Sequence, residues 1–145
     1  MLDQVAIIFE NMDEMLRKLK RDSYESNMKK FREAYGHFFT EMTESMEEAD
    51  DKDEAAKEIA DTFVEAVKER FAKKGKIRGR KQADLNFFMI YYVFPALLMT
   101  ESEYAGQIAD VLCVEWGNSF SASKIGYTTY EEICKGFRTK ILGIF

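Results

Sequence analysis

Apolar residues recur every three or four positions along most of the chain, which is the spacing of one buried stripe on an α-helix. Such stripes cover residues 5–19, 24–42, 56–71, 104–116 and 130–141. Polar residues fill the positions between them, and convincing strand alternation is absent. The pattern therefore predicts five amphipathic helices that bury one face each.

Residues 84–99 break this pattern because they are apolar on every side. The run is shorter than the roughly 20 residues that a membrane-spanning helix needs. We therefore expect a central helix buried by the others, and no membrane span. Pro95 lacks the N–H that would bond the Tyr91 carbonyl, so we expect a kink there unless the helix ends.

Together these segments predict an all-α fold, a bundle of about six helices around the central helix 84–99. Residues 1–145 suit a single domain, and the 46% hydrophobic content supplies ample core material. One proline and eight glycines are too few turn-formers for a sandwich or barrel of many short strands. Gly36 either weakens the second helix or lets another backbone come close.

Four helix starts carry an acceptor side chain followed three residues later by Glu, the pattern of an N-terminal cap. The pairs are Asp22 with Glu25, Asp51 with Glu54, Thr100 with Glu103, and Thr129 with Glu132. Gly75 is the expected stop of the helix that covers 56–71.

The net charge of −5 hides two oppositely charged stretches. Residues 41–54 hold eight acids and one base, Lys52, whereas residues 68–81 hold eight bases and one acid. The candidate polyanion contact comprises Lys73, Lys74, Lys76, Arg78, Arg80 and Lys81. The alternative is a solvated helix end paired with the acidic stretch of this or another molecule. Nucleic acid is not favoured, since the following helix is too apolar to enter a groove.

The aromatic residues around Pro95 form a second candidate site. A kink could splay the helices and leave an apolar pocket for a small, flat ligand. The pocket would be lined by Phe87, Phe88, Tyr91, Tyr92, Phe94 and Pro95. The alternative is a bulky, filled core, because aromatics at helical spacing usually pack inside.

The residues that carry catalysis or bind metals are scarce. His37 is the only histidine, and no second histidine completes a di-iron set. A zinc site from His37, Cys113 and Cys134 would need a convergence from three helices. No catalytic residue, metal site or cofactor is therefore predicted, and the two cysteines are expected to pack as small hydrophobes.

The segment Thr129-Tyr130-Glu131-Glu132-Ile133, followed by Gly136-Phe137-Arg138 and Lys140, resembles a segment of uncharacterised bacterial helical proteins. The resemblance implies a bacterial, all-helical domain and carries no activity. The first nine residues lack the basic start of a signal peptide, so the cytoplasm is the expected location.

Four functions stay open at this point, the last of which is an enzyme for which no catalytic residue is predicted. The first is a non-enzymatic interaction or regulatory module that binds a protein partner or a second copy. Its candidate surfaces are the seam on residues 24–42, the basic segment 73–81 and the apolar C-terminal stretch. The second function is a binder of small hydrophobic ligands beside Pro95, and the third is a polyanion binder.

Overall fold

A computed structural model describes residues 2–74, 80–120, 124–125 and 128–129, with only the backbone described at residues 2, 71–74, 80–83 and in the strands. The helices are α1 (Leu2–Glu10), α2 (Met12–Lys18), α3 (Tyr24–Glu48), α4 (Lys52–Lys74), α5 (Arg80–Phe88), the π-helical turn η1 (Met89–Val93), α6 (Phe94–Leu98) and α7 (Ala105–Phe120). Two short antiparallel strands follow, β1 (Lys124–Ile125) and β2 (Thr128–Thr129). The predicted all-α class is confirmed.

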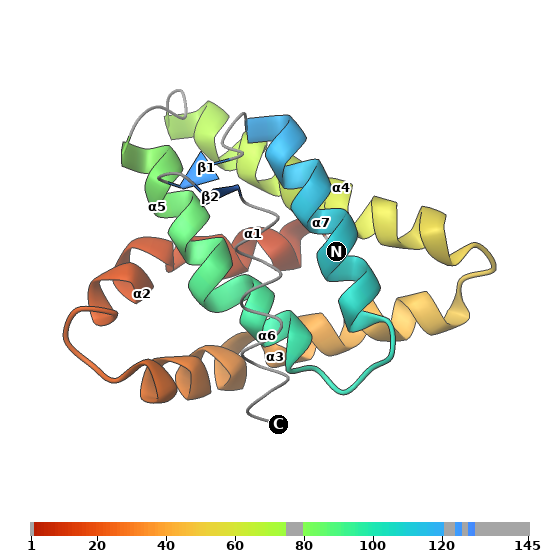
Figure 1. Cartoon of the computed structure of the whole chain (residues 1–145), viewed down its shortest axis with the longest axis horizontal. Helices are drawn as coiled ribbons and strands as arrows, with labels where there is room; N and C mark the ends of the chain where they lie inside the picture. Colours follow the sequence, from red (N-terminus) through yellow and green to blue (C-terminus); the bar gives the residue numbers. More distant parts are fainter. Residues whose placement is uncertain (1, 75–79, 121–123, 126–127, 130–145) are drawn as a thin grey trace.

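The helices cross around a single long rod made of α5, η1 and α6 (Figure 1). Helix α4 packs most extensively against α7 and also against α1, while α3 packs against α6 and α4. The described buried side chains of these helices form one continuous core. The expected helix 84–99 is thus present at the centre of the fold.

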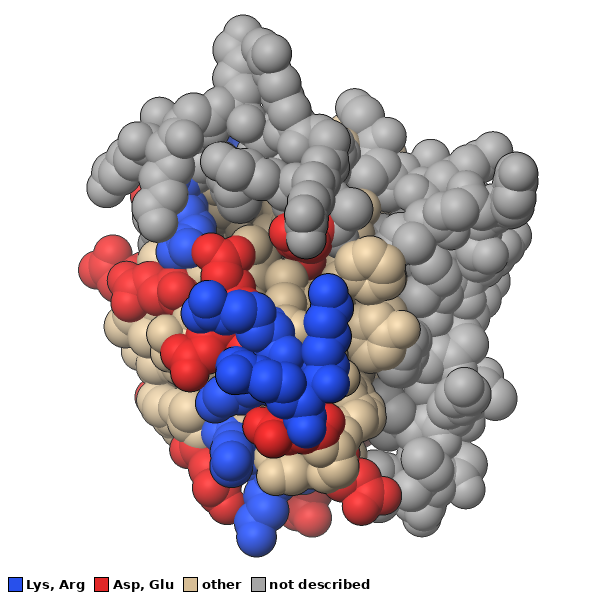
Figure 2. Space-filling model, turned by 90° about the vertical axis from the view of Figure 1, so that its left-hand side faces the viewer, with Lys and Arg blue, Asp and Glu red and all other residues tan. Residues whose placement is uncertain are grey.

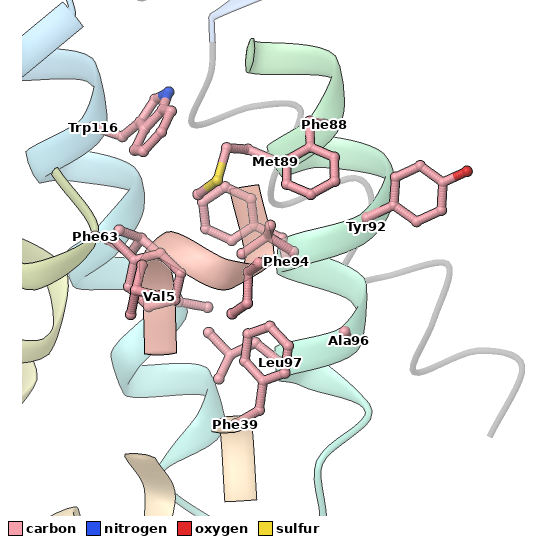
Figure 3. Packing of buried hydrophobic residues seen from close by; sticks show 14 of the residues in the cluster. Val5, Phe39, Phe63, Phe88, Met89, Tyr92, Phe94, Ala96, Leu97 and Trp116 are labelled. Carbon is pink, nitrogen blue, oxygen red and sulfur yellow. The ribbon is translucent and has the colours of Figure 1, made fainter. Parts of the chain in front are cut away.

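Aromatic rings fasten the core together (Figure 3). The ring of Phe9 on α1 lies 5.4 Å from Phe88, 6.3 Å from Trp116 and 6.4 Å from Phe63, measured between centroids. One side chain therefore joins α1 to α5, α7 and α4. The pairs with Phe63 and Phe88 are edge to face and the pair with Trp116 is stacked, and such aromatic pairs add to the free energy gained from apolar burial alone.

Pro95 is accommodated by a local change of helix type rather than by a break. The five residues before α6 form a π-helical turn, in which the N–H of Phe94 donates to the carbonyl of Met89, five residues earlier. A wider turn adjacent to proline adjusts the backbone where the ordinary bonding pattern is interrupted. The helix does not end at Pro95: the π-helical turn precedes it, and the rod continues to Leu98.

The first stripe does not form one helix from 5 to 19, as expected, but two. The chain leaves the helical conformation at Asn11, whose φ is −99° and ψ is 13°. The Asn11 side chain donates a hydrogen bond of 2.6 Å to the Tyr35 hydroxyl on α3. This tertiary contact holds an asparagine, a weak helix former, in the non-helical conformation that separates α1 from α2.

The predicted caps have mixed outcomes. The Asp51 carboxylate accepts from the Glu54 N–H at 3.1 Å, as predicted. The cap of α3 is Ser23 and not Asp22, because the Ser23 hydroxyl accepts from the Ser26 N–H at 3.2 Å.

The cap predicted at Thr100 is wrong. Its hydroxyl turns back to donate to the Ala96 carbonyl at 3.0 Å, and Ser102 accepts from the Tyr104 N–H at 3.1 Å instead. Thr129 belongs to β2, and the last predicted helix, 130–141, lies outside the described residues.

Candidate interaction surface

The six residues predicted to line a pocket beside Pro95 lie on two different faces of the central rod. Phe88, Tyr92, Phe94 and Pro95 are buried in the core, while Phe87 is exposed and Tyr91 is half-buried. The buried rings are close to rings of other helices: Phe31 on α3 lies 5.9 Å from Phe88 and 5.3 Å from Tyr92. This packing resembles the filled core that the sequence allowed as the alternative.

The exposed side of the rod carries a strip of three aromatic rings, which we call the aromatic strip: Tyr24, Tyr91 and Phe87. Phe87 and Tyr91 are one helical turn apart and stack with ring centroids 6.0 Å apart at 23°. Tyr24, at the start of α3, meets Tyr91 edge to face at 6.1 Å. Tyr24 and Phe87 are each 38% exposed. The rings thus form a continuous apolar surface contributed by two helices.

A hydrogen bond from Tyr24 fixes this strip to the rod. The Tyr24 hydroxyl donates to the main-chain carbonyl of Tyr91. In a regular α-helix that carbonyl would accept from residue 95, but Pro95 has no N–H to donate. Partial burial, and then the nearby Tyr92 and Tyr91 hydroxyls, raise the pKa of Tyr24 well above its usual value. The phenol therefore stays protonated and keeps its role as donor.

Next to the strip, the end of α2 and the following residues carry four bases, Arg17, Lys18, Lys20 and Arg21, which we call the basic turn. Figure 2 looks onto this end of the molecule and shows Lys and Arg side chains gathered there, with Asp and Glu side chains among them and uncharged residues beside them. Lys18 lies 3.9 Å from Glu14, one helical turn earlier. Within the described part of the chain, Arg17, Lys20 and Arg21 form no ion pair.

Two side chains from the core form hydrogen bonds to the end of α2, and these bonds fix the position of the basic turn. The Tyr92 hydroxyl donates to the Met15 carbonyl at 2.8 Å, and the Asn27 amide donates to the Lys18 carbonyl at 3.1 Å. Both carbonyls lie in the last turn of α2, and that of Lys18 also accepts from the N–H groups of Arg21 and Asp22. Burial raises the pKa of Tyr92 to about 12; the hydrogen bond with Asn27 opposes this rise, and the nearby Asp22 carboxylate adds a smaller increase. The donor is therefore neutral throughout the physiological range.

The predicted polyanion contact is described only in part. Lys73 and Lys74 end α4, and Arg80 and Lys81 begin α5, but their side chains lie outside the description. Lys76 and Arg78 lie wholly outside the described residues. The acidic stretch 41–54 lies at the opposite end of α4, about 30 Å away at 1.5 Å per residue. The two ends of α4 are therefore too far apart to pair with each other, and the alternative of pairing with the rest of the acidic stretch stays a prediction.

The single base of the acidic stretch has a structural role. Lys52 donates from its Nζ to the carbonyls of Met46, Glu47 and Ala49 at 2.7, 2.9 and 2.7 Å. Its Nζ also lies 5.3 Å from the centre of the Tyr104 ring. A cation at a helix C-terminus opposes the partial negative charge of the last carbonyls. Lys52 thus caps α3, whose last turn is otherwise acidic.

The remaining candidates lie apart from this surface or outside the described residues. The seam on α3 is internal, because Met28, Phe31, Tyr35, Phe38 and Met42 are buried and only Tyr24 reaches the surface. His37 is exposed beside Phe38. Cys113 is buried, and Cys134 lies outside the described residues. No cluster of three potential metal ligands occurs among the residues that the structure describes.

Sequence reasoning missed the combined surface because its parts are far apart in the chain. Tyr24 was assigned to the seam, and Phe87 and Tyr91 to the pocket. The run Arg17-Lys18-Leu19-Lys20-Arg21, with four bases in five residues, was the available signal for the basic turn.

Comparison of the chain with protein families, with curated proteins and with solved structures finds no match. None of the described helices has the length and apolarity to cross a membrane. The class is therefore defined by the fold and the surface alone: an all-α bundle with an aromatic strip beside a basic turn.

Proposed function

We propose that the protein is a non-enzymatic interaction module that binds a protein partner through the aromatic strip and the basic turn. The observation that carries this proposal is the juxtaposition of Tyr24, Tyr91 and Phe87 with the basic turn, in which Lys18 alone forms an ion pair among the described residues. Aromatic residues and arginine are enriched in protein interfaces, where rings supply contact area and guanidinium groups pair with carboxylates.

The chemistry of the surface favours an acidic amphipathic segment as its partner. Apolar side chains of the partner would cover the rings, and its carboxylates would pair with Arg17, Lys20 and Arg21. Ring centroids at 6.0 and 6.1 Å steps give a strip about as long as two turns of helix. This length fits the anchors that an amphipathic helix presents at positions i, i+4 and i+7.

Two features favour a protein over a membrane or a nucleic acid. The rings lie against one another and are only partly exposed. They therefore form a flat surface and do not protrude as side chains that insert into a membrane would. The exposed acids Asp22 and Glu25 lie within the same region, and the net charge is −5. Uniform polyanions are repelled by such acids, whereas a protein partner can place its charges selectively.

A photo-crosslinking amino acid at position 87, in the native host, tests the proposal. Val114 on α7, which is 52% exposed, provides a matched apolar position for the control. The proposal predicts a discrete protein adduct at position 87 that is absent at 114 and is lost when Arg17 and Arg21 become Ala. Equal labelling at both positions, or none at 87, would contradict it.

A further inference from the structure

We propose that the basic turn and the aromatic strip of one molecule bind the acidic stretch 41–54 of a second copy, head to tail. The acidic stretch comprises the last two turns of α3, the connection to α4 and the first residues of α4. The inference rests on the proposed function and names the partner that the surface binds. Both surfaces lie in the described part of the chain.

The two surfaces lie at opposite ends of the molecule. Figure 1, with the longest axis horizontal, places the connection between α2 and α3 at one end and the connection between α3 and α4 at the other. Helix α3 joins them, and its 25 residues span about 37 Å at 1.5 Å per residue. This length is several times the screening length of about 8 Å at physiological ionic strength. The two ends of α3 therefore cannot pair with each other within one molecule.

The acids in the last two turns of α3 work against the helix itself. They are all exposed, and they are Glu41, Glu44, Glu47 and Glu48. None of them forms an ion pair within the described residues, and Lys52 donates to main-chain carbonyls instead. Negative charge at a helix C-terminus is unfavourable, as is a like-charge pair four residues apart such as Glu44 and Glu48. Bases from outside the helix are therefore needed to offset this repulsion.

The basic turn of another molecule can supply these bases. Arg17, Lys20 and Arg21 are exposed, and they lie next to the apolar rings of the aromatic strip. The acidic stretch also has apolar surface beside its charges, because Ala49 is half-buried and so is Tyr104, whose ring lies near the one base of that stretch. Each surface thus combines charge with apolar area, and the charges are of opposite sign. Such complementarity favours the correct partner and fixes its orientation.

A second copy is the partner for which the chain itself carries the complementary surface. Every molecule exposes both surfaces, so the partner is present at the concentration of the protein. A contact between two unlike surfaces is heterologous, and it leaves one surface of each kind free on every pair. Further copies can therefore add at both ends, and the mean mass is expected to rise with concentration beyond that of a dimer.

Charge reversal tests the contact in the purified full-length chain, by sedimentation equilibrium over a range of concentrations. The wild type is expected to associate, about tenfold or more weakly in 0.5 M salt than in 0.05 M salt. Two double variants, Arg17→Glu with Arg21→Glu and Glu44→Lys with Glu48→Lys, should each stay monomeric. A wild type that is monomeric at every concentration would overturn the proposal, as would association that stops at a dimer.

Mixing the two double variants in equal amounts is the sharpest part of the test. Each variant alone carries two surfaces of the same sign, which repel each other. In the mixture, the reversed turn of one variant meets the reversed stretch of the other, and the unchanged surfaces also match. Association should therefore return, and this recovery requires that both variants are folded. A mixture of folded variants that stays monomeric overturns the proposal.

Two further variants separate the contact from a general effect of charge. Glu65→Lys with Glu69→Lys, two exposed positions on α4, has the same spacing and the same change of charge, and should associate like the wild type. Glu44→Gln with Glu48→Gln removes the acids without adding repulsion, and should weaken association by about tenfold. Equal weakening by the control and by the glutamine pair overturns the proposal.

The crosslink at position 87 keeps the two proposals apart. The head-to-tail contact predicts an adduct with twice the mass of the chain. An adduct with a different protein, together with a monomeric purified chain, overturns this inference and leaves the proposed function standing.

Discussion

The hydroxyl of Tyr24 donates a hydrogen bond to the main-chain carbonyl of Tyr91, the carbonyl from which proline at position 95 removes the ordinary helical donor. Residues 67 positions apart are thereby joined at the one proline of the chain. The bond ties the start of α3 to the central rod and holds the aromatic strip together.

Replacing Tyr24 by Phe removes this donor but keeps the ring. We expect the free energy of unfolding to fall by about 0.5–1.5 kcal/mol, the usual net contribution of one hydrogen bond. In a Pro95→Ala background, the new N–H can serve the carbonyls of the rod, and the cost of Tyr24→Phe should shrink. A double-mutant cycle by urea denaturation measures the coupling. Additive costs would show that the two residues act independently.

Lys52 is expected to stabilise the end of α3. Lys52→Met removes three charged hydrogen bonds to main-chain carbonyls while keeping the apolar stem. We expect a loss of about 1.5–3 kcal/mol, the range for hydrogen bonds to charged groups. Lys57→Met is the control, since the exposed Lys57 pairs in the described part of the chain with the exposed Asp61 and the half-buried Glu115, and such surface pairs contribute little. Equal losses in the two variants would argue against the cap.

Gly36 can be replaced with a gain in stability. A Cβ at this position meets no atom within 4 Å, so no neighbouring backbone requires the glycine. The position lies in the interior of α3, where alanine is favoured over glycine by about 1 kcal/mol. Gly36→Ala should therefore raise the thermal midpoint. A lower thermal midpoint would contradict this prediction and show that Gly36 stabilises the folded protein in some way other than by allowing close packing.

Tyr92 makes the stability of the fold sensitive to alkaline pH. Its pKa rises from 10.0 to about 12, chiefly because burial disfavours the phenolate. The unfolded chain loses this proton first, so the free energy of unfolding is unaffected below pH 10 and falls between pH 10 and 12. Absorbance of the phenolate in folded and denatured protein, together with denaturation at each pH, tests this. The Tyr92→Phe variant should lose part of the dependence.

Periodicity was sufficient to predict the class of the fold, but not the contacts that distant residues make. Unbroken apolarity marked the central helix, most of whose side chains are buried, but it did not reveal the side on which Phe87 and Tyr91 reach the surface. The cap at Asp51 was found because it depends on residues three positions apart.

Errors arose where tertiary contacts override local preference. The break at Asn11 depends on the hydrogen bond from its side chain to the Tyr35 hydroxyl. The carbonyl that Pro95 leaves without its usual helical donor accepts a hydrogen bond from Tyr24. The candidate surface escaped prediction for the same reason, since α2, α3 and the central rod each supply part of it. Of this surface, only the run of basic residues at 17–21 can be recognised from a continuous stretch of sequence.

The central claim is that the aromatic strip is the binding surface, and an affinity measurement tests it most directly. Once crosslinking at position 87 has identified the partner, its dissociation constant is measured by calorimetry for the wild type, Phe87→Ser and Val114→Ser. We predict binding weaker by about tenfold or more for Phe87→Ser, roughly 1.4 kcal/mol or greater, and unchanged binding for Val114→Ser. Equal affinities in all three proteins would contradict the claim.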